Sequence, residues 1–503
     1  MAPVVRTPYG QVAGEQRDGV TVFRGIPYAR APLGELRFRA PQPPEPWSDV
    51  RDATRFGPIA MQNPSPMDTI FGAVQRPAMS EDCLSLNVWT PGLDDGRRPV
   101  MVWIHGGAIV GGSGSTPWYD GTAFASRGDV VVVTLNYRLG ALGFLHLADL
   151  GGDAFAGSGN VGILDQVAAL RWVRESIAAF GGDPENVTIF GESAGAMSVG
   201  TLLGLPSARG LFRRAILQSG GASNVKSAGQ ATEITHQILT ALHITPEQTG
   251  ELSEIPAEAL LKAQAEVSEA NRNGGIPFEP VIDGVVLPGP VLDSVAAGGT
   301  ADVSMLAGTT LDEMRLFTAF DPTAGVADEA DLLNRCAAIF GTEVRGTAAL
   351  ATYRRTRPAA TPSDMWSAIA TDQVFRVPAV RLLDQQSRHQ EQSWMYLFTW
   401  ASPAFDGKLG SCHALEIPFV FNTLDAPGAS GFTGDTTPEM RTLADTMQNA
   451  WIAFARTGDP NHPDLPAWPR YESSRRATMV LGSSCAPAED LYAELEVWEE
   501  VPA

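Results

Sequence analysis

Short apolar runs recur along the chain and are separated by segments with helical periodicity. The run Val130–Tyr137, VVVVTLNY, is apolar at nearly every position, which is typical of a strand that is covered on both faces of its sheet. Further runs of this character occupy residues 99–107, 186–190, 214–219, 303–308 and 394–400. The pattern predicts a large, mostly parallel sheet with helices on both faces.

The segment between residues 160 and 182 predicts one of these helices. Its apolar residues recur at spacings of three and four, which places them on one helical face. They are Ile163, Val167, Leu170, Val173 and Ile177. Gly181 and Gly182 follow and are expected to end the helix. Alternating strands and helices indicate an α/β fold with right-handed crossovers.

The length of the chain bears on its domain organisation. Its 503 residues exceed an ordinary domain, but strand-like runs resume after each of two polar, helical regions. We therefore expect one α/β domain over residues 1–503, with helical insertions around 223–277 and 320–380.

Charge and cysteine content restrict the classes of partner. The net charge is -21, from 36 basic and 57 acidic residues, which argues against nucleic acid and anionic membrane surfaces as partners. The sequence has no apolar run long enough for a membrane span and no signal-peptide pattern at its start, so we expect a cytoplasmic protein. Four widely spaced cysteines predict free thiols and no metal site: Cys83, Cys336, Cys412 and Cys485.

The segment Phe180–Gly200 carries the strongest chemical signal. Ser193 lies between Gly191 and Gly195, after a strand-like run and before a helix-like run. A nucleophilic serine has to project from a sharp strand-to-helix turn, and small neighbours relieve the crowding there. The pattern predicts that Ser193 is a nucleophile, and a structural serine in a tight turn is the alternative.

A nucleophilic serine needs a base and an acid that lie further along the chain. Of the seven histidines, His413 is the best candidate for the base because it follows the strand-like run 394–400. Asp312 and Glu313 follow the run 303–308, and their positions alone do not decide which of them is the acid.

Backbone amides that could bind an oxyanion are expected in two places. One is the amide of Ala194, directly after the serine, and the other is the Gly-rich loop Ile104–Ser115. A phosphate-binding loop is the alternative for this loop, but the chain has neither GxxxxGK[ST] nor GxGxxG in a βαβ context.

Several longer segments together resemble the type-B carboxylesterases, which have the α/β-hydrolase fold. The segments are Val22–Trp47, Glu81–Pro91, Leu135–Leu145 and the stretch FGGDPENVTIFGESAG around the serine, so the resemblance covers essentially the whole chain. It implies a gorge formed by the helical insertions and a serine carboxylesterase without cofactors, which acts on small esters through an acyl-enzyme. A carbamate or amide hydrolase with the same residues remains an alternative.

The resemblance also implies roles for individual residues. Ser193 is expected to be the nucleophile, Glu313 the acid and His413 the base, and a catalytically inactive binding homologue is disfavoured because all three are present. The expected oxyanion donors are the amides of Gly107, Ala108 and Ala194. Glu192 and Ser219 are expected beside the triad, and Ile70 and Phe71 in the wall of the substrate pocket.

Three departures from the family pattern refine these expectations. Ala108 replaces a frequent glycine but still offers its amide. Ala60 stands where secreted members have a cysteine that pairs with the equivalent of Cys83. The segment 67–79 lacks the tryptophan of cholinesterases, and its apolar residues predict a preference for neutral esters with short to medium acyl chains or aromatic groups. We expect a monomer or a weak homo-oligomer.

Overall fold

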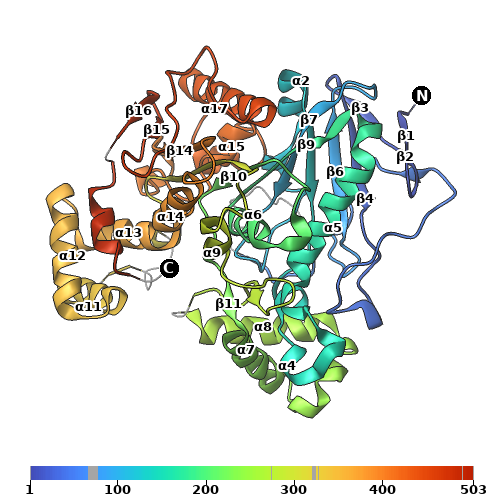
Figure 1. The fold of residues 1–503 in the computed structure, drawn as a ribbon, viewed down its shortest axis with the longest axis horizontal. Helices are drawn as coiled ribbons and strands as arrows, with labels where there is room; N and C mark the ends of the chain where they lie inside the picture. Colours follow the sequence, from blue (N-terminus) through green and yellow to red (C-terminus); the bar gives the residue numbers. More distant parts are fainter. Residues whose placement is uncertain are drawn as a thin grey trace.

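A large sheet runs through the centre of the molecule (Figure 1) in the computed structural model, which describes residues 2–65, 77–272, 275–319, 325–326, 328–489 and 491–501. In the described residues the sheet has eleven strands, in the order β16-β15-β14-β13-β10-β9-β7-β8-β6-β4-β3. From one edge to the other these are Ala486–Ala488, Thr478–Leu481, Ser393–Phe398, Ser304–Thr310, Arg214–Gln218, Gly182–Glu192, Arg98–Ile104, Val131–Leu135, Ser85–Thr90, Val20–Pro27 and Glu15–Arg17.

The strands from β15 to β8 are parallel to one another, and antiparallel pairs occur only towards the two edges of this sheet as described. In the middle of the sheet, Val102 of β7 is in register with Val133 of β8 and Ile189 of β9. The prediction of a mostly parallel sheet is therefore confirmed.

Alternate residues of the central strands enter two separate hydrophobic cores. In β7, Val100 and Val102 belong to one core, whereas Met101 and Trp103 belong to the other. All four side chains are fully buried, because both faces of the sheet are covered. This arrangement explains why the sequence of the strand is apolar at consecutive positions.

Helices pack on both faces of the sheet, as expected. One core is shared with α5 (Val161–Ser176), α6 (Ala194–Gly204) and α14 (Val377–Gln386), and the other with α2 (Thr122–Gly128) and α17 (Pro438–Thr457). The helix predicted after residue 160 is α5, which continues as a short 3-10 turn to Phe180. Gly181, with φ of 79°, ends this turn, but Gly182 is already the first residue of β9.

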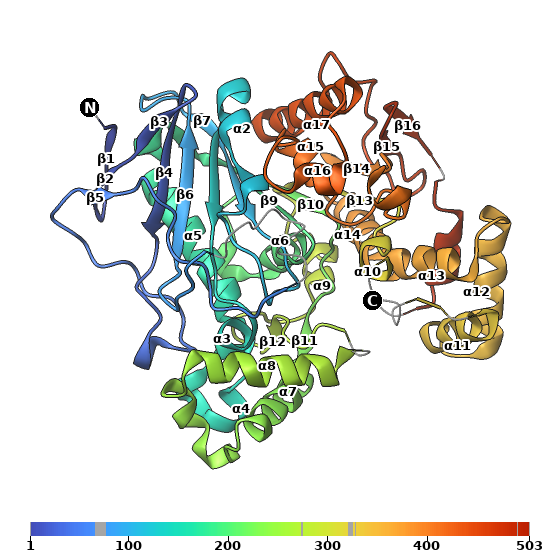
Figure 2. The same cartoon turned by 180° about the vertical axis from the view of Figure 1, so that it is seen from behind.

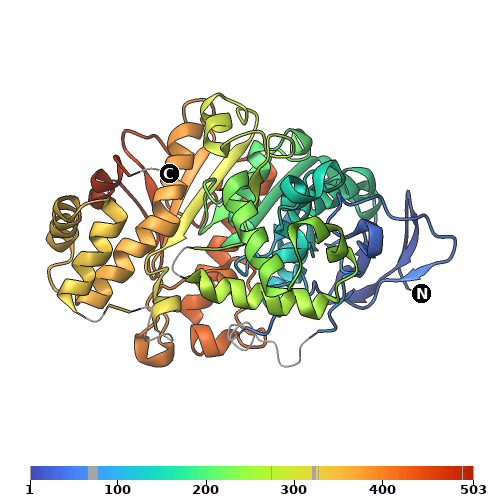
Figure 3. The same cartoon turned by 90° about the horizontal axis from the view of Figure 1, so that it is seen from below.

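The two regions predicted as insertions are helical. The first contains α7 (Ala228–Ala241), η7 (Pro246–Ser253) and α8 (Ala257–Ala270), and the second α11 (Glu329–Phe340), α12 (Glu343–Thr356) and α13 (Pro362–Thr371). Figure 2 shows α11 and α12 beside the body of the molecule, and in Figure 3 the yellow-green helices of the first region lie in front of the sheet. After these regions β13 and β14 return to the same sheet. No described helix has both the length and the apolar composition that a membrane span requires.

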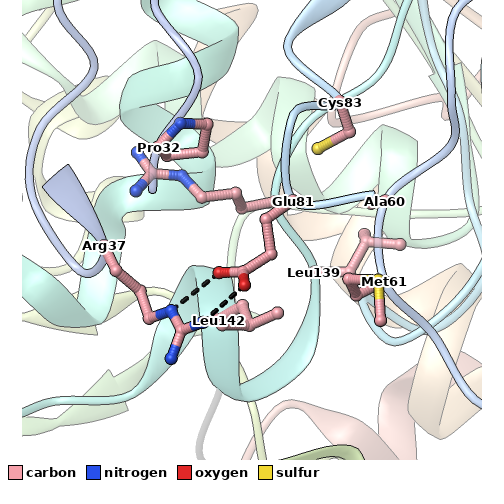
Figure 4. A pocket seen from close by; sticks show the side chains of 9 residues that line it. Pro32, Arg37, Ala60, Met61, Glu81, Cys83, Leu139 and Leu142 are labelled. Carbon is pink, nitrogen blue, oxygen red and sulfur yellow. Dashed lines mark hydrogen bonds and ion pairs between the residues drawn. The ribbon is translucent and has the colours of Figure 1, made fainter. Parts of the chain in front are cut away.

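Cys83 lies next to a small cavity of about 10 Å³ (Figure 4). Ala60 lines the same cavity, so the residue that replaces the expected cysteine partner is indeed a neighbour of Cys83. Burial raises the pKa of the Cys83 thiol well above its usual range. All four cysteines belong to the part of the chain that the structure describes, and all are free.

Candidate active site

The three residues predicted to form a triad follow neighbouring parallel strands at their carboxyl ends. Ser193 directly follows β9, Glu313 follows β13, and His413 lies in the loop after β14. In the sheet these strands are separated only by β10, so their loops lie at one edge. This edge is where open α/β sheets place their binding sites.

Ser193 occupies a strained turn between β9 and α6. Its backbone has φ of 56° and ψ of -128°, a conformation that is strained for every residue except glycine. A Cβ atom on Gly195 would lie 2.0 Å from the carbonyl oxygen of Ile104, and one on Gly191 would lie 2.6 Å from the backbone of Gly195. The two glycines are therefore required for the strand–turn–helix geometry, as the sequence predicted.

Glu313 and His413 are in direct contact. The Oε2 atom of Glu313 lies 2.6 Å from Nδ1 of His413, and its Oε1 atom accepts a 2.7 Å hydrogen bond from the amide of Thr310. Glu313 is fully buried and His413 is almost so. The neighbouring Asp312 instead accepts a 2.9 Å hydrogen bond from the amide of Ser411. The structure thus pairs Glu313, and not Asp312, with the histidine.

The other ring nitrogen of His413 faces Glu192. Nε2 lies 3.0 Å from Oε1 of Glu192, although the two atoms do not have hydrogen-bond geometry. Among the described residues Ser193 Oγ forms no hydrogen bond with His413, so the acid and the base are joined while the serine and the base are not. Such contacts are often long in free enzymes and shorten when substrate binds.

Two buried glutamates, Glu192 and Glu313, contact the histidine, and a third, Glu416, lies close enough to both to interact with their charges. Burial, followed by the charge of Glu313, raises the pKa of Glu192 well above its usual range. Burial, followed by the charges of Glu192 and Glu313, raises the pKa of Glu416 to about 8. Glu416 also accepts a 3.1 Å hydrogen bond from the side chain of Gln218. These surroundings favour the protonated forms of Glu192 and Glu416.

The loop after β7 presents free amides beside the serine. Gly107 and Ala108 have φ angles of 110° and 54°, and a Cβ atom on Gly107 would lie 2.3 Å from the carbonyl oxygen of Gly111. Within the described chain their two amides donate to no acceptor. Ala194 is the first residue of α6, where helical amides lack an intrahelical partner. The three predicted donors are thus available for an anionic oxygen.

The remaining predicted residues have different outcomes. Ser219 directly follows β10, between the strands that lead to Ser193 and Glu313, and its Oγ is buried without a partner among the described residues. Ile70 and Phe71 lie outside the described residues, so their place in the substrate pocket stays a prediction. Of the His, Cys, Asp and Glu side chains that are described, no group of three or more is arranged to hold a metal ion.

Two aromatic residues near the histidine were not anticipated. The ring of Phe375 lies 4.6 Å from that of His413, measured between centroids, and the ring of Phe317 lies 5.3 Å from it. Phe317 is 41% exposed, so an aromatic side chain reaches the surface close to this histidine. Phe375 lies in the second helical region, where no local sequence signal points to a site. Glu416, three residues after His413, was missed because its contacts with Gln218 and the other glutamates form only in the fold.

Comparisons with known proteins agree with this geometry. The model of the carboxylesterase family matches residues 1–497. The chain is 42% identical over 496 residues to para-nitrobenzyl esterase of Bacillus subtilis, which covers 98% of this chain and 97% of that protein. It is 37% identical to phenmedipham hydrolase of Pseudarthrobacter oxydans, over 97% of both chains. The solved structure of a carboxylesterase from Geobacillus stearothermophilus has a TM-score of 0.89 and 46% identity, and the match covers 99% of this chain and all of that one.

Proposed function

This chain belongs to the carboxylesterase family and is a carboxylic ester hydrolase, and we propose that Ser193, His413 and Glu313 are its catalytic triad. The observation that carries the proposal is the 2.6 Å contact between Glu313 and His413 at the sheet edge where the strained Ser193 projects. A serine, a histidine and a buried acid in this order form the usual apparatus of acyl transfer.

The contact assigns the proton on the imidazole. Because the Glu313 carboxylate accepts from Nδ1, the ring carries its proton there, and Nε2 is left as the basic atom. Nε2 takes the proton of Ser193 Oγ while Oγ attacks the ester carbonyl. The imidazolium then donates this proton to the departing alcohol, and water repeats the sequence on the acyl-enzyme.

The loop after β7 stabilises the negative oxygen. Among the described residues the amides of Gly107, Ala108 and Ala194 donate to no acceptor, so they can bind the oxygen of the tetrahedral intermediate without first breaking another hydrogen bond. A protonated Glu192 beside Nε2 assists the first step, because a carboxylate in that place would hold the imidazole as a cation before the serine is deprotonated.

We propose that the preferred substrates are neutral esters with short to medium acyl chains or aromatic groups. Phe317 and Phe375 offer apolar contact close to His413, and each buried methylene contributes about 0.8 kcal/mol to binding. The net charge of -21 opposes the approach of anionic substrates. The proposal includes a monomer or weak homo-oligomer in the cytoplasm, which size-exclusion chromatography and cell fractionation test.

The triad is tested with Ser193→Ala. We expect kcat for a para-nitrophenyl ester to fall by roughly 10⁴-fold or more while the melting temperature is maintained, and a fluorophosphonate to label Ser193 in the parent protein. Ser126→Ala serves as the matched control, since Ser126 is exposed on α2. Retained turnover in Ser193→Ala, or label on a different serine, contradicts the proposal.

A further inference from the structure

A widened helical turn packs against the turn that carries Glu313. Helix α13 continues through a π-helical turn, η9 (Asp372–Arg376), into α14, and the amide of Val377 donates to the carbonyl oxygen of Asp372. Pro378 has no amide, and its ring crowds the carbonyl of the residue four positions earlier, so an ordinary α-helical turn is disfavoured here. Figure 2 shows α14 beside β13, against which it packs.

Arg376 in this turn binds the backbone that leads to Glu313. Its Nη2 atom donates to the carbonyl oxygens of Thr310 at 3.2 Å and Leu311 at 3.1 Å. The amide of the same Thr310 donates to Oε1 of Glu313 at 2.7 Å. Thr310 is therefore bound on both sides, by Arg376 at its carbonyl oxygen and by the Glu313 carboxylate at its amide.

Two further contacts join η9 and its flank to the site. The Oγ1 atom of Thr371, immediately before η9, accepts a 3.1 Å hydrogen bond from the amide of Met314, the residue after Glu313. The ring of Phe375 packs against that of His413 with centroids 4.6 Å apart. The helix thus contacts the backbone on both sides of Glu313 and the ring that Glu313 binds.

Arg376 is itself held in place by a buried chain of polar groups. Its Nη1 atom pairs with Asp372, and Asp372 accepts a 2.5 Å hydrogen bond from the hydroxyl of Tyr353. That hydroxyl accepts a 2.8 Å hydrogen bond from the indole N–H of Trp498. Arg376 and Asp372 are 3% and 2% exposed, so little solvent competes with these contacts.

We propose that Arg376 is a positioning residue of this esterase: it fixes the turn between β13 and Glu313 so that the Glu313 carboxylate faces His413. The inference rests on the proposed triad and extends it to a residue that touches neither the substrate nor the reacting atoms. A structural ion pair without influence on catalysis is the competing explanation.

Charge supplies a readout that separates the two explanations. The buried titratable groups around Glu313 are His413 and Cys412 in the loop after β14, Tyr396 on β14, Glu192 at the end of β9, and Glu416. The adjacent Asp312 is partly exposed and pairs with Arg315. On the side of η9 the buried groups are Asp372 and Arg376. Arg376 is the cation of this buried set that stays charged at all working pH values. Its removal takes a positive charge away from the turn that carries Glu313, so we expect the acidic limb of the kcat/KM profile to move to higher pH.

The experiment compares Arg376→Met with Arg376→Lys in the full chain. Methionine retains an unbranched side chain but loses the charge and all donors, whereas lysine retains the charge but cannot reach Asp372 and both carbonyls together. With kcat normalised to sites titrated by a fluorophosphonate, we expect Arg376→Met to lower kcat at least tenfold, to change KM less than threefold and to shift the acidic limb upward. Arg376→Lys should restore the limb and part of kcat. Arg381→Met is the control, because Arg381 binds the carbonyl of Trp498 but not the Glu313 turn.

The outcomes separate this inference from the proposed function. A parent enzyme that fluorophosphonate does not label on Ser193 refutes the triad itself. A labelled parent enzyme with kcat and acidic limb unchanged in Arg376→Met refutes the positioning role, even if the melting temperature falls. If Arg376→Met does not fold, Thr371→Val replaces it as the test, because Thr371 binds the amide of Met314. A several-fold loss of kcat per titrated site at constant KM then supports the role of this helix. An unchanged kcat in both Thr371→Val and Arg376→Lys overturns it.

Discussion

Substitution of Glu313 by glutamine, compared with Asp312→Asn, tests which acid of the adjacent pair serves the histidine. Both oxygens of Glu313 accept hydrogen bonds, one from Nδ1 of His413 at 2.6 Å and one from the amide of Thr310 at 2.7 Å. Glutamine has only one acceptor atom. Whichever way its amide is turned, a buried N–H faces another N–H, or the imidazole adopts the tautomer with its proton on Nε2.

The magnitude follows from these contacts. The wrong tautomer leaves no base for Ser193, a defect that costs roughly 10⁴-fold in kcat in serine proteases, which is about 5.4 kcal/mol. We expect a loss of about 10³- to 10⁴-fold for Glu313→Gln. In Asp312→Asn the new amide oxygen can still accept from Ser411, and the ion pair with Arg315, at 3.5 Å and partly exposed, is worth at most about 1 kcal/mol. Its kcat should fall by no more than about fivefold.

The assay is hydrolysis of para-nitrophenyl butyrate, with kcat normalised to the sites that fluorophosphonate titrates in the parent enzyme. Thermal unfolding of each variant controls for loss of fold. Equal losses in the two variants, or a larger loss in Asp312→Asn, would show that the observed pairing of Glu313 with His413 is not the catalytic one.

Three further predictions concern substrate, pH and thiols. Among para-nitrophenyl acetate, butyrate, octanoate and palmitate, kcat/KM should be lowest for palmitate, and a neutral diester should be cleaved faster than its anionic monoester; a maximum at palmitate refutes the apolar-pocket argument. Burial raises the pKa of Glu416 from 4.5 to about 8, so between these pH values the folded chain retains a proton that the unfolded chain has lost. The free energy of unfolding therefore falls as pH rises through this range, by up to about 1.4 kcal/mol per pH unit. Glu416→Gln removes this contribution, so urea unfolding at pH 5.5, 6.5 and 7.5 should give a flatter dependence than in the parent, and equal slopes would count against a protonated Glu416. Thiol titration of the unfolded, unreduced protein should find four free cysteines, and a disulfide detected by mass spectrometry would contradict the predicted cytoplasmic location.

The parts of the fold that the sequence predicted are those with a local pattern. The run Val130–Tyr137 became β8, and the periodic residues of 160–182 became α5, because burial of one or both faces leaves a repeating trace in the sequence. The boundaries were less accurate. Strand β9 spans Gly182–Glu192 and not only 186–190, since pairing with β7 and β10 extends it past the apolar run.

The residues of the candidate site likewise fall into those with a local sequence pattern and those without one. Ser193 was found because its turn requires nearby glycines, which are neighbours in the sequence. The choice between Asp312 and Glu313 depends on which side chain the turn directs inward, and that is decided by contacts with Ser411 and Thr310. Arg376 was missed because it lies in the second helical region and meets this turn only in the folded chain, and such a contact has no local signature.

During synthesis from the N-terminus, Ser193 is made about 300 residues before Trp498. At about 5–20 residues per second, the ribosome needs roughly 15 to 60 s for this stretch. Tyr353 is made within this time, and until Trp498 follows, its hydroxyl lacks the indole donor that completes the buried chain to Asp372 and Arg376. With the role that we propose for Arg376, the nascent chain therefore carries Ser193 before the helix that positions Glu313 is fully secured.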